Sequence, residues 1–335
     1  MSITRIPYTN TALATARRCL TEFDLRYLQR LDRENESREA LDVGTTWHKA
    51  FERMEQGALD AGVPSSECHA LGYAAINAHA PSPLWAEKLR RLFAAYHWYW
   101  QSQPFEFVDV ESSFEVELNG KTYRGQRDGR IRIDGQVGLL ERKTTGSSIS
   151  DGASWWDVLP MGVQVGLYAL SCGERPAFIL FDVVRKPTIN PKGLTKKILE
   201  RFAEEVKEHG FATYYGERVE PEAVELAAKT GEESLELYGA RLTADIGDRP
   251  DYYFARQPAP RTMADYDTLL GNLDAQAELI EFAIDRGFLH RNPDQCQAFG
   301  TCSFFALCSN NIRPHVGDDA PEGYVRREHL HPELA

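Results

Sequence analysis

The sequence predicts an α/β fold in which a mixed central sheet is flanked by helices, with further helical segments toward both ends of the chain. Three observations lead to this fold class. The first hundred residues repeat apolar side chains at helical spacing, residues 107–141 alternate with a period of two, and a helical segment separates that run from another apolar stretch at 177–184. Strands, a helix and then a strand indicate at least one crossover connection in the sheet.

The N-terminal part reads as helices. Residues 11–31 place apolar side chains such as Leu13, Leu20 and Tyr27 on one face of a helix, and residues 45–55 and 84–100 show the same periodicity. We therefore expect a helical part over residues 1–105.

The strands follow as a short antiparallel meander. Residues 107–111 and 114–118 alternate, and residues 123–133 alternate again after the hairpin signal Asn119–Gly120. A second turn signal, Asp134–Gly135, precedes an apolar strand at 137–141. Together these segments predict a sheet core over residues 106–190.

The rest of the chain continues this core without a break. A Gly/Ser-rich loop (144–152), a helix (158–171) and a strand (177–184) are followed by helices at 194–215 and 262–288. No internal repeat or low-complexity linker divides the chain. We expect one domain over 1–335, with a helical part at 191–290, a cysteine-bearing segment at 291–310 and a tail at 311–335.

Composition restricts the class of protein. The 335 residues are 42% hydrophobic and 26% charged, and they contain no apolar run long enough to span a membrane. Residues 1–20 lack the apolar stretch of a secretory signal, so we expect a cytoplasmic protein.

The charge distribution gives a mixed signal about nucleic acids. The net charge of −12 argues against phosphate binding, yet Lys121 to Lys143 contains seven basic and three acidic residues. A basic surface for nucleic acid is therefore one interpretation of this segment. Solvated strand and helix faces are the simpler explanation for most of these charges.

Two carboxylates and a lysine stand out in the strands. Asp128 ends one strand and Glu141 ends the next but one element, so a hairpin turn between them can bring the two strand ends together. Mg²⁺ prefers oxygen ligands, often one or two carboxylates with water. Lys143 lies two residues after Glu141 and so shares its face of the strand. This arrangement is typical of metal-assisted hydrolysis of phosphodiesters.

The motifs resemble the PD-(D/E)XK nuclease superfamily, and within it the RecB-like exonucleases. Four motifs support the resemblance. Gly125 with Asp128 forms one and Glu141 with Lys143 forms another. The helix segment 44–48, which ends in His48, precedes them, and the helix pair Gln164 and Tyr168 follows them. The similarity covers roughly residues 10–310, and the order of all four elements fits. One departure is Glu141, where this family often has Asp.

Each element alone has a simpler explanation. An acidic residue two before a lysine is common on solvated strands, Asp128 followed by Gly129 is a turn signal, His48 fits a packed helix, and Gln164 and Tyr168 fit a helix-surface pair. Their joint order favours the nuclease interpretation.

The resemblance implies roles for these residues. His48, Asp128 and Glu141 would be side-chain ligands of Mg²⁺ or Mn²⁺, and the Arg142 carbonyl would add another ligand. Lys143 would be catalytic together with Asp128 and Glu141. Glu52, one turn after His48, would hold a metal-bound water. The pair at 164 and 168 would position the DNA backbone or Lys143.

Four of the six cysteines form a separate pattern. Cys19 lies near the N-terminus, and Cys296, Cys302 and Cys308 follow at equal spacing near the C-terminus. Four thiolates can hold a 4Fe-4S cluster or zinc, although no C-x2-C pair typical of zinc is present. The alternative is four inert buried thiols.

The arrangement resembles the iron–sulfur branch of the RecB-like nucleases, which includes the CRISPR-adaptation exonucleases and AddB-type nuclease domains. It implies a cluster that joins the terminal helical segments, with zinc as the less favoured occupant. Cys68 and Cys172 read as ordinary cysteines.

The resemblance implies a metal-dependent DNA exonuclease that acts at DNA ends, on single-stranded DNA, in phage recombination, DNA repair or defence. A structure-specific or restriction-type endonuclease and a catalytically inactive nucleic-acid-binding subunit are the alternatives. The sequence does not show which protein partners the chain has.

Overall fold

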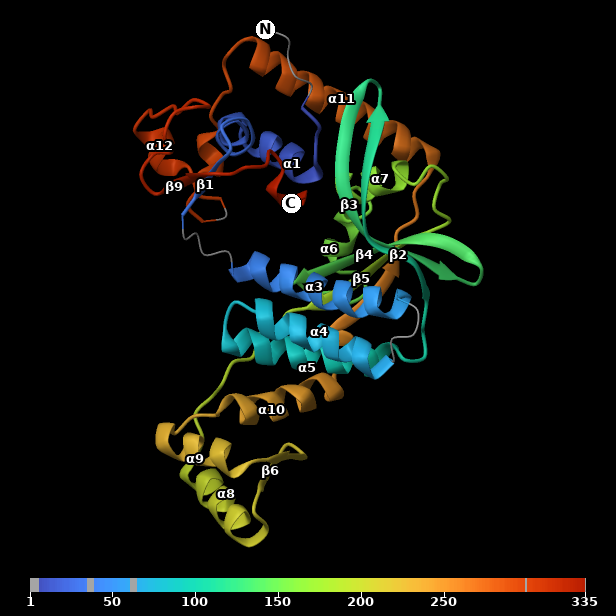
Figure 1. Ribbon diagram of the computed structural model, residues 1–335. Coiled ribbons are helices and arrows are strands. Elements are labelled where there is room, and N and C mark those ends of the chain that lie inside the picture. Colours follow the sequence, from blue (N-terminus) through green and yellow to red (C-terminus); the bar gives the residue numbers. More distant parts are fainter. Residues whose placement is uncertain (1–5, 35–38, 61–64, 299, 335) are drawn as a thin grey trace.

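A five-stranded sheet with the order β2–β3–β4–β5–β8 forms the centre of the molecule. The computed structural model (Figure 1) describes residues 6–34, 39–60, 65–298 and 300–334. The strands are β2 (Glu106–Leu118), β3 (Lys121–Ile133), β4 (Gln136–Thr145), β5 (Ile179–Arg185) and β8 (Phe254–Pro258). β2, β3 and β4 pair antiparallel, β4 and β5 pair parallel, and β8 returns antiparallel to β5. The predicted mixed sheet is confirmed.

Two tight turns connect the meander. Asn119 and Gly120 have φ of 49° and 73°, and Asp134 and Gly135 have φ of 50° and 79°. Positive φ at both central residues is the geometry of the type I′ turn, which matches the right-handed twist of the flanking strands. Both hairpins therefore lie where the sequence predicts them. The parallel connection from β4 to β5 runs through α6 (Ser154–Val158) and α7 (Val163–Leu170).

Helices cover both faces of the sheet. One face is covered by α3 (Glu39–Leu59), α4 (Ser65–His79) and α5 (Pro83–Trp100), and the other by α6, α7 and α11 (Met263–Asp285). Because side chains alternate along a strand, Phe181 and Val183 of β5 pack in the α7-side cluster, whereas Val184 packs with Trp47 and Phe93 on the α3 side.

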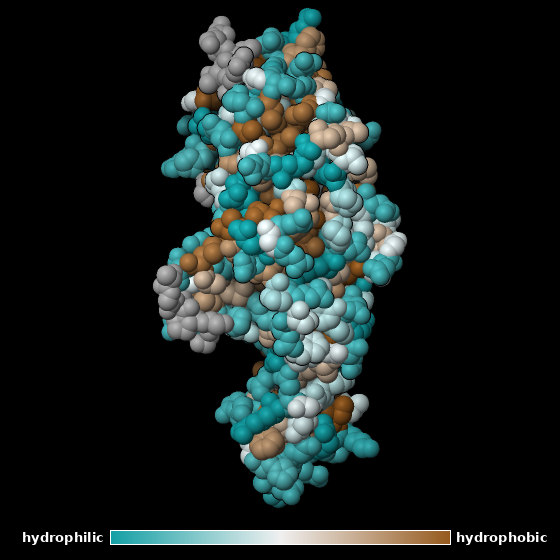
Figure 2. Space-filling view, turned by 90° about the vertical axis from the view of Figure 1, so that its right-hand side faces the viewer, coloured by the Kyte–Doolittle hydropathy of each residue, from teal (hydrophilic) through white to brown (hydrophobic). Residues whose placement is uncertain are grey.

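A small lobe extends below α5 in Figure 1. It consists of α8 (Lys196–His209), β6 (Ala212–Tyr214), β7 (Glu217–Val219), α9 (Pro221–Thr230) and α10 (Leu235–Asp248), with its own apolar cluster. The helix expected over 194–215 ends early, because Gly210 adopts a φ of 79° at its C-cap. The lower end of the molecule, where this lobe lies, is largely hydrophilic in the side view of Figure 2.

The two ends of the chain lie together beside the sheet core. The N-terminal elements are α1 (Asn10–Arg18), α2 (Leu20–Phe23), the π-helix η1 (Asp24–Leu28) and β1 (Leu31–Arg33). The C-terminal elements are η3 (Pro293–Gln295), α12 (Phe305–Ser309), β9 (Tyr324–Arg326) and η4 (Pro332–Leu334). The short helix η2 (Pro250–Tyr252) lies elsewhere, next to α10 and β8. β1 pairs antiparallel with β9. Within the described ranges, no helix is long and apolar enough to cross a membrane.

The helix expected over residues 11–31 is interrupted at Cys19. This residue has extended backbone angles (φ −163°, ψ 120°) and separates α1 from α2. The apolar spacing continues across the break because both helices contribute to one cluster with α11. The apolar periodicity therefore predicted the buried face of the two helices but not the interruption between them at Cys19.

Candidate active site

α3 brings His48 to the sheet. Gly44, one turn earlier, allows the helix to approach β4 closely, because a Cβ there would lie 3.3 Å from Thr144 Oγ1. Trp47 is buried in the core between α3 and α5 and fixes the rotation of the helix. His48 therefore points toward the middle of β3, where Asp128 lies. The sequence prediction that Asp128 and Glu141 end their strands is wrong, because β3 continues to Ile133 and β4 to Thr145.

Asp128 receives contacts from two sides. Its Oδ2 accepts a 2.6 Å hydrogen bond from the Arg142 backbone N–H, and its Oδ1 lies 3.5 Å from His48 Nδ1. Burial by itself would raise the pKa of Asp128, but His48, Lys143 and the Arg142 amide hold it below its ordinary value. Asp128 is therefore held as a carboxylate.

Glu141 and Lys143 point to the same side of β4, toward α7. Lys143 Nζ lies 2.5 Å from Glu141 Oε1 and donates a 2.7 Å hydrogen bond to Gln164 Oε1. Gln164 Nε2 in turn donates to the Tyr168 hydroxyl at 2.8 Å. Gln164 and Tyr168 of α7 thus form a chain of hydrogen bonds that ends on Lys143.

The Glu141 carboxylate is buried and has few polar partners. Its side chain is 1% exposed, and its oxygens accept no hydrogen bond within the described structure, leaving the Lys143 ammonium as its charged partner. Burial and the nearby Asp128 raise the pKa of Glu141 to about 7, against the opposing effect of Lys143. Such a carboxylate fits a divalent cation, whose charge would offset its burial.

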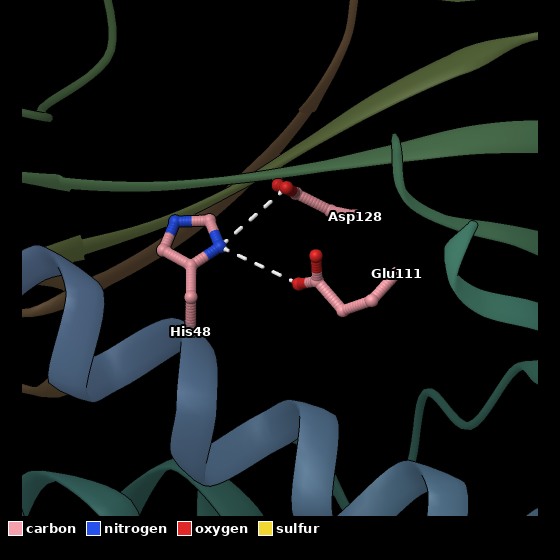
Figure 3. Close-up of side chains that lie close together, drawn as sticks. All are labelled: His48, Glu111 and Asp128. Carbon is pink, nitrogen blue, oxygen red and sulfur yellow. Dashed lines mark ion pairs between the residues drawn. The ribbon is translucent and has the colours of Figure 1, made fainter. Parts of the chain in front are cut away.

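Glu111 joins this group, although no sequence pattern singled it out. Its Oε1 lies 4.0 Å from His48 Nδ1. One ligand atom each from His48, Glu111 and Asp128 all lie within 4.8 Å of one another, and Figure 3 shows the three side chains pointing toward a common space. We refer to His48, Glu111, Asp128 and Glu141 as the metal centre. An imidazole with carboxylates suits Mn²⁺ as well as Mg²⁺.

The family profile of the PD-(D/E)XK nuclease superfamily matches residues 7–308. The chain belongs to this superfamily. A solved structure described as "Crystal structure of SSO0001" is similar over 59% of this chain and 84% of that chain, with 19% sequence identity and a TM-score of 0.21. A likeness at that level carries no argument about function. No curated protein matches the chain.

Membership of the PD-(D/E)XK superfamily makes this protein a metal-dependent nuclease.

Packing explains why a glycine stands at the start of the motif that contains Asp128. Gly125 lies opposite Phe114 in the β2–β3 ladder, and a Cβ at Gly125 would come within 2.6 Å of the Phe114 ring. The glycine thus allows this aromatic ring to lie across the strand and to line the cleft described below.

The nuclease site rests on a buried ionic network. Arg142 points to the side of β4 opposite Glu141 and pairs with Glu55, which lies on α3 two turns after His48. Both side chains are at most 3% exposed, and Asp182 lies 3.7 Å from Arg142. Burial would lower the pKa of Arg142, but these carboxylates raise it above its ordinary value. The pair thus ties the helix that carries His48 to the strand that carries Glu141.

A cleft of about 1350 Å³ lies over the metal centre. Its lining comes from α1, α3, β3 and α7, and from the C-terminal residues Gln295, Gly300, Thr301, Cys302, Ser303, Arg327 and Glu333. The lining contains eight Lys or Arg and five Asp or Glu residues, so the cleft is locally basic although the chain carries a net charge of −12. Glu52 also lines the cleft and lies close enough to Glu111 to affect its titration.

The basic run from Lys121 to Lys143 contributes little free charge to that cleft. Six of its seven basic side chains pair with carboxylates: Lys121, Arg124, Arg130, Arg132, Arg142 and Lys143. Arg127 donates to Ser171 Oγ instead. The simpler explanation, structural charge pairs, therefore applies to most of the run, and two of its members, Arg124 and Lys143, line the cleft.

The four cysteines singled out by the sequence line one pocket of about 170 Å³, which we call the cysteine pocket. It contains Cys19, Cys296, Cys302 and Cys308, all free thiols, with Phe304 and Phe305 beside them. Burial raises the pKa of the Cys302 thiol to about 11. Cys68 and Cys172 lie elsewhere, on α4 and after α7.

Proposed function

We propose that this nuclease is a DNA exonuclease of the RecB-like branch that acts at the ends of single-stranded DNA. His48, Asp128 and Glu141 supply side-chain ligands to the metal centre, and the Arg142 carbonyl adds a backbone ligand. Mg²⁺ or Mn²⁺ is the cation. Enzymes of this kind serve phage recombination, DNA repair or defence.

One observation carries the proposal: Lys143 is held between Glu141 and Gln164 beside the buried Asp128, at the base of the cleft. A bound cation would neutralise phosphate charge and lower the pKa of water. The Lys143 ammonium offsets negative charge that develops on the scissile phosphate and orients the attacking water. Burial raises the pKa of Tyr168, so its hydroxyl stays neutral and keeps a proton for a phosphate oxygen.

The cleft supports a single strand as substrate. Its basic lining suits a phosphate backbone, and Phe114 and Tyr168 form an edge-on aromatic pair beside the site at a ring separation of 5.7 Å. Residues of the C-terminal part, among them Thr301, Arg327 and Glu333, line the same cleft as Asp128 and Lys143. A strand that enters by its free end passes along this cleft to Lys143.

The test is a cleavage assay on 5′- and 3′-labelled single- and double-stranded DNA with Mn²⁺, Mg²⁺ or chelator. Lys143→Ala should lower the cleavage rate by about a thousandfold or more, because the ammonium acts on the transition state. DNA affinity should stay within about threefold, because one phosphate contact among many is lost. The matched control is Lys196→Ala, an exposed lysine on α8.

Circular single-stranded DNA separates the alternatives. An exonuclease leaves the circle intact, whereas rapid cleavage of the circle would make the protein an endonuclease. Wild-type binding without any metal-dependent cleavage would favour an inactive binding subunit. Unimpaired cleavage by Lys143→Ala would refute the assignment of the site.

We also propose that the cysteine pocket holds a 4Fe-4S cluster. Four thiolates around one zinc ion would lie about 3.8 Å apart, given a Zn–S distance near 2.3 Å. Among the described residues, no three of the four sulfur atoms lie within 4.8 Å of one another. This wider spacing favours a cluster over a single ion, and a cytoplasmic setting suits thiols that stay reduced. Iron, zinc and visible absorbance measured on anaerobically purified protein distinguish the two occupants.

A further inference from the structure

The helix α3 presents two rows of side chains to the cleft. His48 and Glu52, four residues apart, face the metal centre, where both lie close enough to Glu111 to affect its titration. Lys49 and Arg53 each follow one position later, so they form a second row beside the first on the same helix. All four side chains line the cleft. We call Lys49 and Arg53 the α3 rim.

The α3 rim carries positive charge that the described protein does not neutralise. Five of the eight basic residues in the cleft lining pair with carboxylates: Arg18, Arg26, Arg124, Lys143 and Arg327. Lys49 and Arg53, in contrast, make no hydrogen bond or ion pair with any residue that the structure describes. The field of the α3 rim is therefore available to a ligand in the cleft.

The position of the α3 rim indicates that this ligand is an anion. Lys49 is partly buried, and a cation that is partly withdrawn from water is stabilised by a charged partner. In Figure 1 the helices α4 and α5 lie on one side of α3 and the terminal elements lie on the other, and the cleft lies on the side of the terminal elements. Solvated charges on an open surface would not need to line this cleft.

A DNA strand supplies such an anion at a suitable distance. The rise along α3 from Lys49 to Arg53 is about 6 Å, and His48 lies within the same turn. A strand with its scissile phosphate at the metal centre therefore brings a further phosphate within reach of these two long side chains. Contacts to phosphate fix the position of a strand and carry no information about its bases.

We propose that Lys49 and Arg53 bind the phosphate backbone of the DNA strand beside the scissile phosphate. The α3 rim holds the strand over the metal centre without reading its sequence, and the strand crosses α3 next to His48. This inference rests on the proposed nuclease function and adds to it the part of the substrate that is bound outside the metal centre.

The experiment measures the affinity of the full chain for a labelled oligothymidine in chelator, over a range of salt concentrations. Lys49→Ala/Arg53→Ala should weaken binding by about tenfold or more. It should also reduce the slope of log affinity against log salt by about 1.4, because each phosphate contact on a single strand contributes about 0.7. The matched control is Lys197→Ala/Arg201→Ala, which removes a lysine and an arginine at the same spacing from α8, outside the cleft lining.

Variants that keep the charge separate phosphate binding from side-chain shape. Lys49→Arg/Arg53→Lys should bind the oligothymidine within about threefold of wild type, because both cations remain. In cleavage assays the double alanine variant should raise KM by about tenfold or more, whereas kcat falls by less than about threefold, because the lost contacts hold substrate and transition state alike. Circular dichroism checks that each variant is folded.

An unchanged salt slope in the folded double alanine variant, or an equal loss of affinity in the α8 control, would overturn the proposal. The proposed nuclease function fails in a different way. If wild type binds the oligothymidine with the expected loss in the variant but cleaves no DNA with any metal, the α3 rim binds DNA and the catalytic assignment is wrong.

Discussion

The metal centre and the cysteine pocket are both built from metal-binding side chains, but the protein holds them in different ways. The metal centre is drawn from one helix and neighbouring strands, and backbone ladders and the buried Arg142–Glu55 pair hold its parts together. The cysteine pocket joins distant parts of the chain, where Thr21 donates a hydrogen bond to the carbonyl of Leu289, 268 residues away. The difference teaches that loss of a ligand at the metal centre should mainly affect catalysis, whereas loss of a ligand in the cysteine pocket should mainly affect folding.

Loss of the cysteine pocket should have the largest effect on stability. With the proposed cluster in the pocket, Cys302→Ser should remove the iron and lower the thermal midpoint by about 10 °C, because a long cross-link of this kind contributes about 3–5 kcal/mol and each kcal/mol corresponds to about 2–4 °C. Scanning calorimetry and iron analysis measure both. Cys172→Ser is the matched control, because a hydroxyl can keep the bond of Cys172 to the Tyr168 carbonyl. Equal thermal midpoints for Cys302→Ser and wild type would contradict the stabilising role of the cysteine pocket.

The ionic network under the metal centre should come next. Glu55→Gln leaves the buried Arg142 guanidinium with Asp182 at 3.7 Å as its remaining nearby carboxylate. Breaking one side of a buried pair costs about 3–5 kcal/mol, and we expect about 3 kcal/mol because Asp182 remains. Urea unfolding measures this loss, with Glu200→Gln on the exposed face of α8 as control. A change below about 1 kcal/mol would mean that the metal centre does not depend on this pair.

The smallest effect should be a pH-dependent stabilisation by metal. Burial, with Asp128 beside it, raises the pKa of Glu111 to about 8. The folded chain therefore binds a proton more tightly than the unfolded chain, so the free energy of unfolding of the metal-free protein falls as pH rises from about 5 to about 8. Excess Mn²⁺ should raise the thermal midpoint by a few degrees more at about pH 8 than at about pH 6. A gain that is larger at the lower pH would contradict the role of these carboxylates.

Much of the core followed from short-range patterns. Alternation and two glycine-containing turns located β2, β3 and β4, and the crossover to β5 followed from element order. The structure also brings His48 near Asp128, and Lys143 near Glu141 and the α7 pair, because β3 and β4 are neighbouring strands and α3 and α7 pack against them.

Glu111 could not be found in the same way. Its position depends on the register of β2 against β3, which shifts at a bulge between Phe107 and Asp109, and on a left-handed backbone at Glu111 itself. Neither feature has a local sequence signal, since such a conformation is usually marked by glycine. β8 was also not foreseen, because a five-residue edge strand at 254–258 gives too short a pattern to distinguish from a loop.

The contact between Thr21 and Leu289 also has a consequence for how the chain is made. At about 5–20 residues per second, a ribosome needs roughly 15–50 s to extend the chain from one partner to the other. During that time α1 lacks the apolar side chains of α11, and Cys19 lacks the other three cysteines of the pocket. The proposed cluster can therefore be loaded only after the C-terminal cysteines have left the exit tunnel.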